Sequence, residues 1–350
     1  MGVDIILESG EFCRFPQQAF VLSRRKLRSR TYLIATGSIP LIPPIIGLLE
    51  VGFLTPETLS LDNLPHEIII LSKTPIGIEL AQNLGRLGKK ITLVVEQSNI
   101  LPEKDFSVIQ LLQGQLEAEG VQILTQSPVT EVKRIHRRKW VKAVKKEIEA
   151  DEIILAMGNQ PNIKDLNLEG VKVKSTSQKI KVNQKLQTTN AKIYTCGSAI
   201  GGYKPANIAK YEASIALNNI LFFPFFKVSY RHLSCVTFTN TTLSTIGLTE
   251  TEARQKNKNN IIVIEEYFKT LYKSQIMGEI TGVCKLITRW NGEILGCHCL
   301  GSQAEELTGI IALAINQKIP SQNLAHLFPP SLSISVILSR IVHQWKDKKI

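Results

Sequence analysis

The sequence lacks the features that would place it in a membrane or outside the cell. No run of apolar residues approaches the ~18 that a membrane-spanning helix needs. The chain also does not open with a charged stretch, an apolar stretch and a small-residue cleavage site. We therefore expect a cytoplasmic protein with no membrane partner.

The cysteines lack the spacing of a local redox pair. The chain has six, and none forms Cys-x-x-Cys or Cys-x-x-x-x-Cys. Their scattered apolar surroundings favour reduced core thiols over a disulfide framework. Cys297-His298-Cys299 invites a metal-site interpretation, but on a strand the two thiols share one face while the imidazole points away. This spacing is also shorter than structural zinc sites use, so we predict buried core cysteines and no metal site.

A dinucleotide-binding turn in the chain lacks two of its glycines. Residues 68–81 run as an apolar strand, a tight turn and an opening helix. In the pattern Gly-x-Gly-x-x-Gly the first glycine makes the turn, the second admits the pyrophosphate and the third lets the helix pack on the strand. Ser72, Thr74 and Gly77 hold those places here. The pattern predicts the βα fold, with nicotinamide binding weak or lost because β-branched Thr74 blocks the phosphates.

Positive charge is in excess, with a formal net charge of +12. It concentrates at residues 24–30, at residues 133–139 and in a lysine-rich tail. Such patches attract nucleic acid or anionic lipid. Apolar residues interleave with the second patch in strand-like fashion, however, and no aromatic stacking platform accompanies it. We therefore interpret the patches as solvated hairpin faces and do not expect a nucleic-acid partner.

Two near-twin segments, 30–40 and 151–161, each lead from a charged residue through an apolar strand to a glycine turn and a proline. They imply two nucleotide-binding sheets. Between and after them the periodicity predicts these elements: strand 68–71, helix 75–87, strand 91–95, helix 105–119, strand 121–125, a basic hairpin over 129–148, a strand near 191–196 and helix 206–221. Beyond residue 229, alternating strands and two helices, 302–316 and 330–344, indicate an α+β module.

Several motifs follow one another along the chain: Ile34-Ala-Thr-Gly-Ser-Ile-Pro, Pro75-Ile-Gly-Ile-Glu-Leu-Ala, Leu155-Ala-Met-Gly-Asn-Gln-Pro-Asn, Ile193-Tyr-Thr-Cys-Gly-Ser, Phe238-Thr-Asn, Thr245-Ile-Gly-Leu-Thr-Glu and Gly292-Glu-Ile-Leu-Gly. In their order and spacing the chain resembles the pyridine nucleotide-disulfide oxidoreductases, in particular the mercuric reductase and dihydrolipoamide dehydrogenase branch. The resemblance implies an α/β fold of Rossmann-like FAD- and NAD(P)-binding domains, with the flavin domain incomplete and a C-terminal α+β dimerisation domain. The implied division is 1–62 with 161–224 for the partial FAD-binding domain, 63–160 for the NAD(P)-binding domain and 225–350 for the dimerisation domain. It also implies a homodimer.

The resemblance begins downstream of the family's flavin-binding βαβ unit and redox cysteines. We therefore expect the chain to bind no FAD by itself. A separate chain supplying that segment, a mispredicted start or gene decay would each explain this. The resemblance assigns Gly37 and Gly158 to the cofactor-binding turns. At the second flavin position it places Gly197 and Ser198 where the family has Gly-Asp, which leaves an uncharged group beside the ribityl chain.

Two glutamates are candidates for the nicotinamide site. Glu96 lies about twenty residues past Gly77 at the end of the next strand, where a carboxylate accepts the ribose hydroxyls and disfavours a 2′-phosphate. NAD is therefore favoured over NADP. By resemblance, Glu79 lies beside the nicotinamide. Both remain open to a plainer interpretation as exposed acids.

The C-terminal segment departs from the disulfide reductases, which carry an acid/base His-Pro dyad. Here Phe328 precedes the proline, so we interpret His326 as a residue at the start of a helix, and no catalytic residue is assigned. By resemblance, the function is hydride transfer from NAD(P)H through flavin to a disulfide or metal acceptor, impaired in a lone chain. The alternative is a non-catalytic dimerising or scaffold protein derived from the same family.

Overall fold

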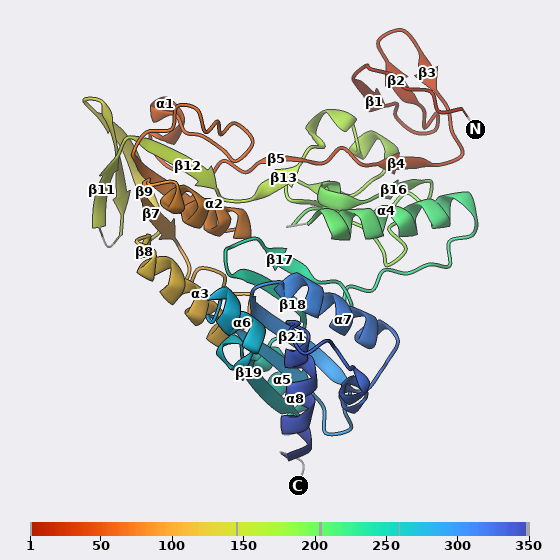
Figure 1. The fold of residues 1–350 in the computed structure, drawn as a ribbon. Coiled ribbons are helices and arrows are strands. Elements are labelled where there is room, and N and C mark those ends of the chain that lie inside the picture. Colours follow the sequence, from red (N-terminus) through yellow and green to blue (C-terminus); the bar gives the residue numbers. More distant parts are fainter. Residues whose placement is uncertain (1, 145, 203–204, 259, 348–350) are drawn as a thin grey trace. The chain divides into compact units, whose positions relative to one another are not determined.

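The computed structural model describes residues 2–144, 146–202, 205–258 and 260–347, so part of the lysine-rich tail lies outside the described residues (Figure 1). The chain divides into two compact units, residues 1–41 with 158–229 and residues 42–157 with 230–350. Residues 42–62, which we predicted in the flavin part, group with the second unit. The three-domain division itself stays a prediction.

The first unit contains a parallel pair of strands, β4 (Tyr32–Ile34) and β16 (Ile193–Thr195). The helix α4 (Ala206–Leu221) follows with the bounds that the sequence predicted. β5 (Ser38–Pro40) pairs antiparallel with β13 (Asn159–Pro161). Shorter elements complete the unit: η1 (Lys164–Leu166), η2 (Glu169–Val171), β14 (Ser175–Thr176), β15 (Lys179–Ile180) and η3 (Gly197–Ile200).

The sequence analysis missed a small antiparallel sheet near the N-terminus. Its strands are β1 (Gly10–Phe12), β2 (Phe20–Leu22) and β3 (Lys26–Leu27). The ring of Phe12 packs edge-on against Phe20 and Tyr32, with centroids 5.1 and 5.4 Å apart, which holds this sheet against β4. The basic segment at 24–30 begins in the turn of the β2–β3 hairpin, which ends at Leu27, and its cations are exposed.

The second unit contains the predicted βαβ series. A parallel sheet has the order β12 (Glu152–Ala156), β6 (Glu67–Ser72), β7 (Lys90–Val95) and β8 (Gln122–Leu124). The helices α2 (Pro75–Arg86) and α3 (Phe106–Ala118) pack on one face, where Ile68 and Ile70 of β6 are buried. The alternate residues Ile69 and Leu71 join a core on the other face. The twin strands β4 and β12 therefore lie in two different sheets, as predicted.

The other face of the parallel sheet is covered by an antiparallel sheet of β9 (Val129–Ile135), β10 (Arg138–Ala143) and β11 (Lys146–Ala150), with α1 (Leu48–Val51). The basic patch at 133–139 forms its β9–β10 hairpin, and most of its cations are exposed. Lys139 is the exception at 5% exposure, because its ammonium pairs with Glu152 and donates to the carbonyl of Gly52. The hairpin interpretation of this patch therefore agrees with the structure.

The C-terminal part of the second unit is a five-stranded antiparallel sheet with helices against it (Figure 1). Its strand order is β17 (Cys235–Thr237), β18 (Thr242–Gly247), β21 (Ile294–Gly301), β20 (Val283–Thr288) and β19 (Ile262–Tyr267). Its helical elements are α5 (Glu250–Asn257), η4 (Phe268–Thr270), α6 (Tyr272–Met277), α7 (Ala304–Asn316), η5 (Ser321–His326) and α8 (Val336–Asp347). The helices α7 and α8 share one core with one face of the sheet.

The predicted helix 330–344 begins later than expected, at Val336. Pro329 and Pro330 lie before it, and the chain makes a turn in which the Ser333 N–H donates to the carbonyl of Pro330 at 3.0 Å. His326 ends η5 instead of starting α8, so the expectation for this residue was wrong. Among the described residues, no helix has the length and apolar character to cross a membrane.

Candidate functional site

The turn after β6 is closed by its own side chains. The Ser72 hydroxyl donates to the carbonyl of Thr74 at 3.1 Å and accepts from the Thr74 N–H at 3.3 Å. A Cβ placed on Gly77 would lie 2.1 Å from the Ser72 oxygen and 3.1 Å from the Ala156 Cβ. The third position of the motif therefore needs glycine for close packing, which is the role that the sequence pattern gave it.

Thr74 is held against the neighbouring strand. Its hydroxyl donates to the carbonyl of Ala156, the last residue of β12, at 2.9 Å. The helix α2 then begins with Pro75, which has no N–H to offer an anion at the helix N-terminus. The start of α2 is thus a poorer phosphate-binding surface than a glycine-rich turn would make.

A cavity of about 220 Å³ lies at the carboxyl ends of β6 and β7. Ligands of open α/β sheets bind in the crevice outside the carboxyl ends of the strands. Ser72 ends β6 and exposed Glu96 directly follows β7, and both line the cavity. The rest of its wall consists of Pro43, Pro44, Ile45, Leu71, Val94, Ser127, Pro128, Val129 and Met157. The structure therefore brings two of the predicted residues, Ser72 and Glu96, to one site.

Glu79 projects from α2 toward the C-terminal sheet. Its carboxylate accepts a hydrogen bond from the backbone N–H of Phe238 at 2.8 Å, just past the end of β17. Burial raises the pKa of this carboxyl, and the Phe238 N–H opposes the rise. Glu79 therefore connects α2 to the C-terminal sheet and does not line the cavity.

The remaining predicted cofactor residues lie in the first unit. Gly37 and Gly158 flank the β5–β13 pair, both with positive φ, at 70° and 95°. The carbonyl of Gly37 accepts from the Asn162 N–H at 3.1 Å, and the carbonyl of Gly158 accepts from the Leu41 N–H at 2.8 Å. These two glycines thus make the turns at which the paired strands begin.

Gly197 and Ser198 open η3 directly after β16. The N–H of Gly197 donates to the carboxylate of Glu212 on α4 at 2.8 Å, and Glu212 is fully buried. Ser198 has an uncharged hydroxyl at the position where, by the family resemblance, we expect the carboxylate that binds the flavin. The sequence analysis did not single out Glu212, because a glutamate in a helix gives no sign by itself that it turns inward.

A family model described as "Pyridine nucleotide-disulphide oxidoreductase" matches residues 2–213. A second, described as "Pyridine nucleotide-disulphide oxidoreductase, dimerisation domain", matches residues 233–339. The chain belongs to the pyridine nucleotide-disulphide oxidoreductase family.

Two relatives match most of the chain. A mercuric reductase of Staphylococcus aureus is 28% identical over 344 residues, which cover 95% of this chain and 62% of that protein. A dihydrolipoyl dehydrogenase of Bacillus subtilis (strain 168) is 28% identical over 349 residues, which cover 95% of this chain and 76% of that protein. The chain spans 62%, 58% and 54% of the length of three mercuric reductases.

Two solved structures share the fold. The HOCl-induced flavoprotein disulfide reductase RclA from Escherichia coli superposes with a TM-score of 0.86 at 23% identity, covering 97% of this chain and 79% of that one. LpdA from Mycobacterium tuberculosis superposes with a TM-score of 0.85 at 21% identity, covering 97% and 76%. The predicted α/β fold with Rossmann-like domains and a dimerisation domain is therefore confirmed.

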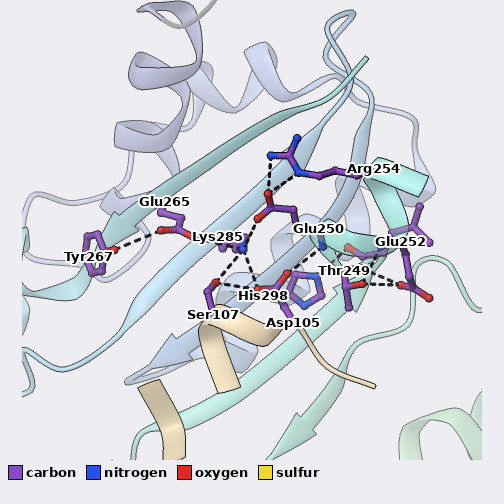
Figure 2. Close-up of polar contacts among 11 residues, drawn as sticks. Asp105, Ser107, Thr249, Glu250, Glu252, Arg254, Glu265, Tyr267, Lys285 and His298 are labelled. Atoms are coloured by element: carbon purple, nitrogen blue, oxygen red, sulfur yellow. Dashed lines mark hydrogen bonds and ion pairs between the residues drawn. The ribbon is translucent and has the colours of Figure 1, made fainter. Parts of the chain in front are cut away.

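A buried charged cluster joins the two segments that match the family models (Figure 2). The ammonium of Lys285 on β20 lies 2.9 Å from the carboxylate of Asp105, which precedes α3, and both residues are 2% exposed. It also lies 2.7 Å from Glu250 and 2.9 Å from the Ser107 hydroxyl. His298, opposite Lys285 on β21, bonds through Nε2 to the carbonyl of Leu248 at 2.9 Å.

The charges in this cluster stabilise one another. Burial alone would raise the pKa of Asp105, but the Glu250 N–H and the Lys285 ammonium outweigh it and hold the pKa below its usual value. Burial likewise would lower the pKa of Lys285, but Glu250 and Asp105 raise it above the usual value. Because none of the residues of the cluster lines the cavity, we assign it to holding the family's two segments together in this unit.

Proposed function

We propose that this protein takes part in transferring reducing equivalents from NADH through flavin to a disulfide or metal acceptor, an activity impaired in the lone chain, which we expect to bind no FAD by itself. Its nicotinamide dinucleotide is held at the cavity of the second unit. The observation that carries the proposal is that Ser72 and Glu96 line one cavity at the carboxyl ends of two adjacent parallel strands. This is where the fold binds dinucleotides. The nicotinamide, when bound, supplies a hydride.

The residues present fit one end of a dinucleotide better than the other. Glu96 offers a carboxylate to the adenosine ribose hydroxyls and repels a 2′-phosphate, which favours NADH over NADPH. The start of α2 is a poorer binding surface for the pyrophosphate, because Thr74 replaces a glycine and Pro75 lacks an N–H. We therefore expect weak binding that depends on Glu96.

Calorimetry with NADH and NADPH tests this assignment. Glu96→Gln should reduce the preference for NADH over NADPH by about tenfold or more, since a hydrogen bond to a charged group contributes about 1.5–3 kcal/mol. The double variant Ser72→Gly with Thr74→Gly should raise the affinity for both cofactors. Glu103→Gln, an exposed glutamate outside the cavity, is the matched control and should change neither.

Two results would count against the proposal. If neither the native chain nor the glycine double variant binds NADH, the turn is not the obstacle and the cavity is not a dinucleotide site. The alternative, a non-catalytic dimerising protein, would then be favoured. If binding occurs but Glu96→Gln leaves the NADH preference unchanged, the role proposed for Glu96 is wrong, and the cavity remains the proposed dinucleotide site.

We further propose that the protein is a homodimer through residues 225–350 and that it is cytoplasmic. The match to a dimerisation domain over residues 233–339 supports the first statement. The second is supported by all six cysteines being free thiols, which persist in a reducing compartment.

A further inference from the structure

Three thiols meet inside the C-terminal sheet. The sulfur of Cys297 lies 3.6 Å from that of Cys299 and 3.9 Å from that of Cys284, and the sulfurs of Cys284 and Cys299 are 3.0 Å apart. All three residues are fully buried. Their sulfurs form a compact triangle that no part of the proposed function uses.

The strand register produces this triangle from residues far apart in the sequence. Cys284 on β20 lies directly opposite Cys299 on β21, and Cys297 follows two residues away on the same face. That face packs against α7 and α8 in an apolar core. Lys285 and His298 alternate with the cysteines and point to the opposite face. The thiol face is shielded from water, and a buried glutamate, Glu266, lies opposite Cys284 on β19.

Two of the three sulfur–sulfur distances suit a metal ion, and the third, 3.0 Å between Cys284 and Cys299, lies between the spacing of a metal site and that of a disulfide. Metal–thiolate bonds of about 2.3 Å in a trigonal arrangement place the sulfurs about 4.0 Å apart. Two of the three distances are already within about 0.4 Å of that value. A disulfide needs about 2.05 Å and would use two of the thiols, leaving the third without a role.

The donor set selects the kind of ion. Within the described residues, the sulfurs form a group of three with no fourth histidine, cysteine or carboxylate ligand. Structural zinc sites take four ligands, whereas soft thiolates in a water-free site suit monovalent copper. Cys297 and Cys299 alone predicted no metal site, but Cys284 supplies a third thiol. We propose that Cys284, Cys297 and Cys299 form a three-coordinate thiolate site for Cu(I). The ion displaces thiol protons to solvent and undergoes no change of oxidation state.

The test uses the full chain, reduced and kept free of oxygen, with Cu(I) buffered by a chromophoric chelator. A second preparation receives copper during expression, because the site is buried. We expect one copper per chain, bonded to sulfur alone in X-ray absorption, and a higher melting temperature for the loaded protein. Cys297→Ser should weaken Cu(I) binding at least about 100-fold. Mutating a residue that only supports a metal ligand typically costs about 10–100-fold in metal affinity, and losing a ligand itself should cost more.

Cys235→Ser is the matched control, because Cys235 lies in the same sheet but outside the triangle. It should bind copper as the native chain does. The proposal is overturned if neither preparation of the native chain holds copper. It is also overturned if the triple serine variant at 284, 297 and 299 holds copper equally, or if Zn²⁺ displaces Cu(I) from the native chain. Because the native-chain spectrum requires no variant, a misfolded Cys297→Ser would not prevent a decision.

Discussion

At the residue scale, the turn after β6 shows how one side chain determines what its neighbour can be. Ser72 occupies the position of the motif's first glycine, and its hydroxyl closes the turn onto Thr74. That hydroxyl also fills the space in front of Gly77. The two positions are therefore coupled, and the effect of a substitution at one on stability should depend on which residue occupies the other.

We predict that Gly77→Ala lowers the free energy of unfolding by about 1–3 kcal/mol, because its Cβ would overlap the Ser72 oxygen. Most of that loss should be recovered when Ser72→Gly is added, since the remaining contact is the looser one to Ala156. Urea denaturation of the single and double variants measures the coupling. Gly114→Ala in α3, where nothing lies within 4 Å of the new Cβ, should be neutral or stabilising. Equal losses with and without Ser72→Gly would show that the overlap is not the cause.

At the scale of elements, the packing of α3 against the C-terminal sheet depends on buried charge. Asp105 directly precedes α3, accepts from the Glu250 N–H at the start of α5 and pairs with Lys285 on β20. One carboxylate therefore connects three elements that are distant in the sequence. A buried pair of this kind costs much when one partner is removed, because the other charge is left unpaired.

Lys285→Met should destabilise the protein by about 3–5 kcal/mol near neutral pH in urea denaturation. Lys256→Met, an exposed lysine on α5, is the control and should stay within about 0.5 kcal/mol. Adding Asp105→Asn to Lys285→Met should recover part of the loss, because it removes the orphaned charge. A loss no larger than that of the control would contradict the structural role of the cluster.

The pH dependence follows from the same cluster. The pKa values of Asp105 and Glu250 are lowered in the folded state, so the stability they contribute is present above their usual pKa near 4 and is lost as pH falls through the lowered values. The pKa of Lys285 is raised, so its contribution persists below its usual value and is lost as pH rises through the raised one. The stability difference between the native chain and Lys285→Met should therefore shrink below about pH 4.

At the scale of the whole molecule, the C-terminal part leaves large apolar side chains on its surface. Tyr272, Ile276 and Phe328 are 66%, 73% and 88% exposed. Exposed apolar residues gathered in a domain of this family are candidates for contact with a second copy. The proposed homodimer would cover such residues, whereas a monomer would leave them in water.

We predict that light scattering of the purified chain gives a dimer at micromolar concentration. Phe328→Glu should shift the equilibrium toward monomer by at least tenfold, because burying an unpaired charge in an interface is costly. Leu87→Glu, which alters an exposed leucine at the end of α2, should leave the dimer intact. A stable, soluble monomer of the native chain would contradict the homodimer.

Local patterns in the sequence predicted the family, the βα units and most element bounds. They could do so because the periodicity of strands and helices and the glycines of turns are properties of a few neighbouring residues. The helix over 206–221 was predicted with the bounds that the structure shows. The helix that begins at Val336 was predicted from residue 330, which is too early because Pro329 and Pro330 favour a turn there. The small N-terminal sheet was missed, since its strands are only two or three residues long.

The chain's own order thus determined that Cys297 and Cys299 share a face, because that follows from the two-residue period of a strand. Only the tertiary structure decided that Cys284 joins them, because the partner of a strand residue is set by register and not by distance along the chain. The same holds for Asp105 with Lys285 and for Ser72 with Glu96, which come from different elements. Contacts of this kind depend on how sheets and helices pack, and no local pattern contains that information.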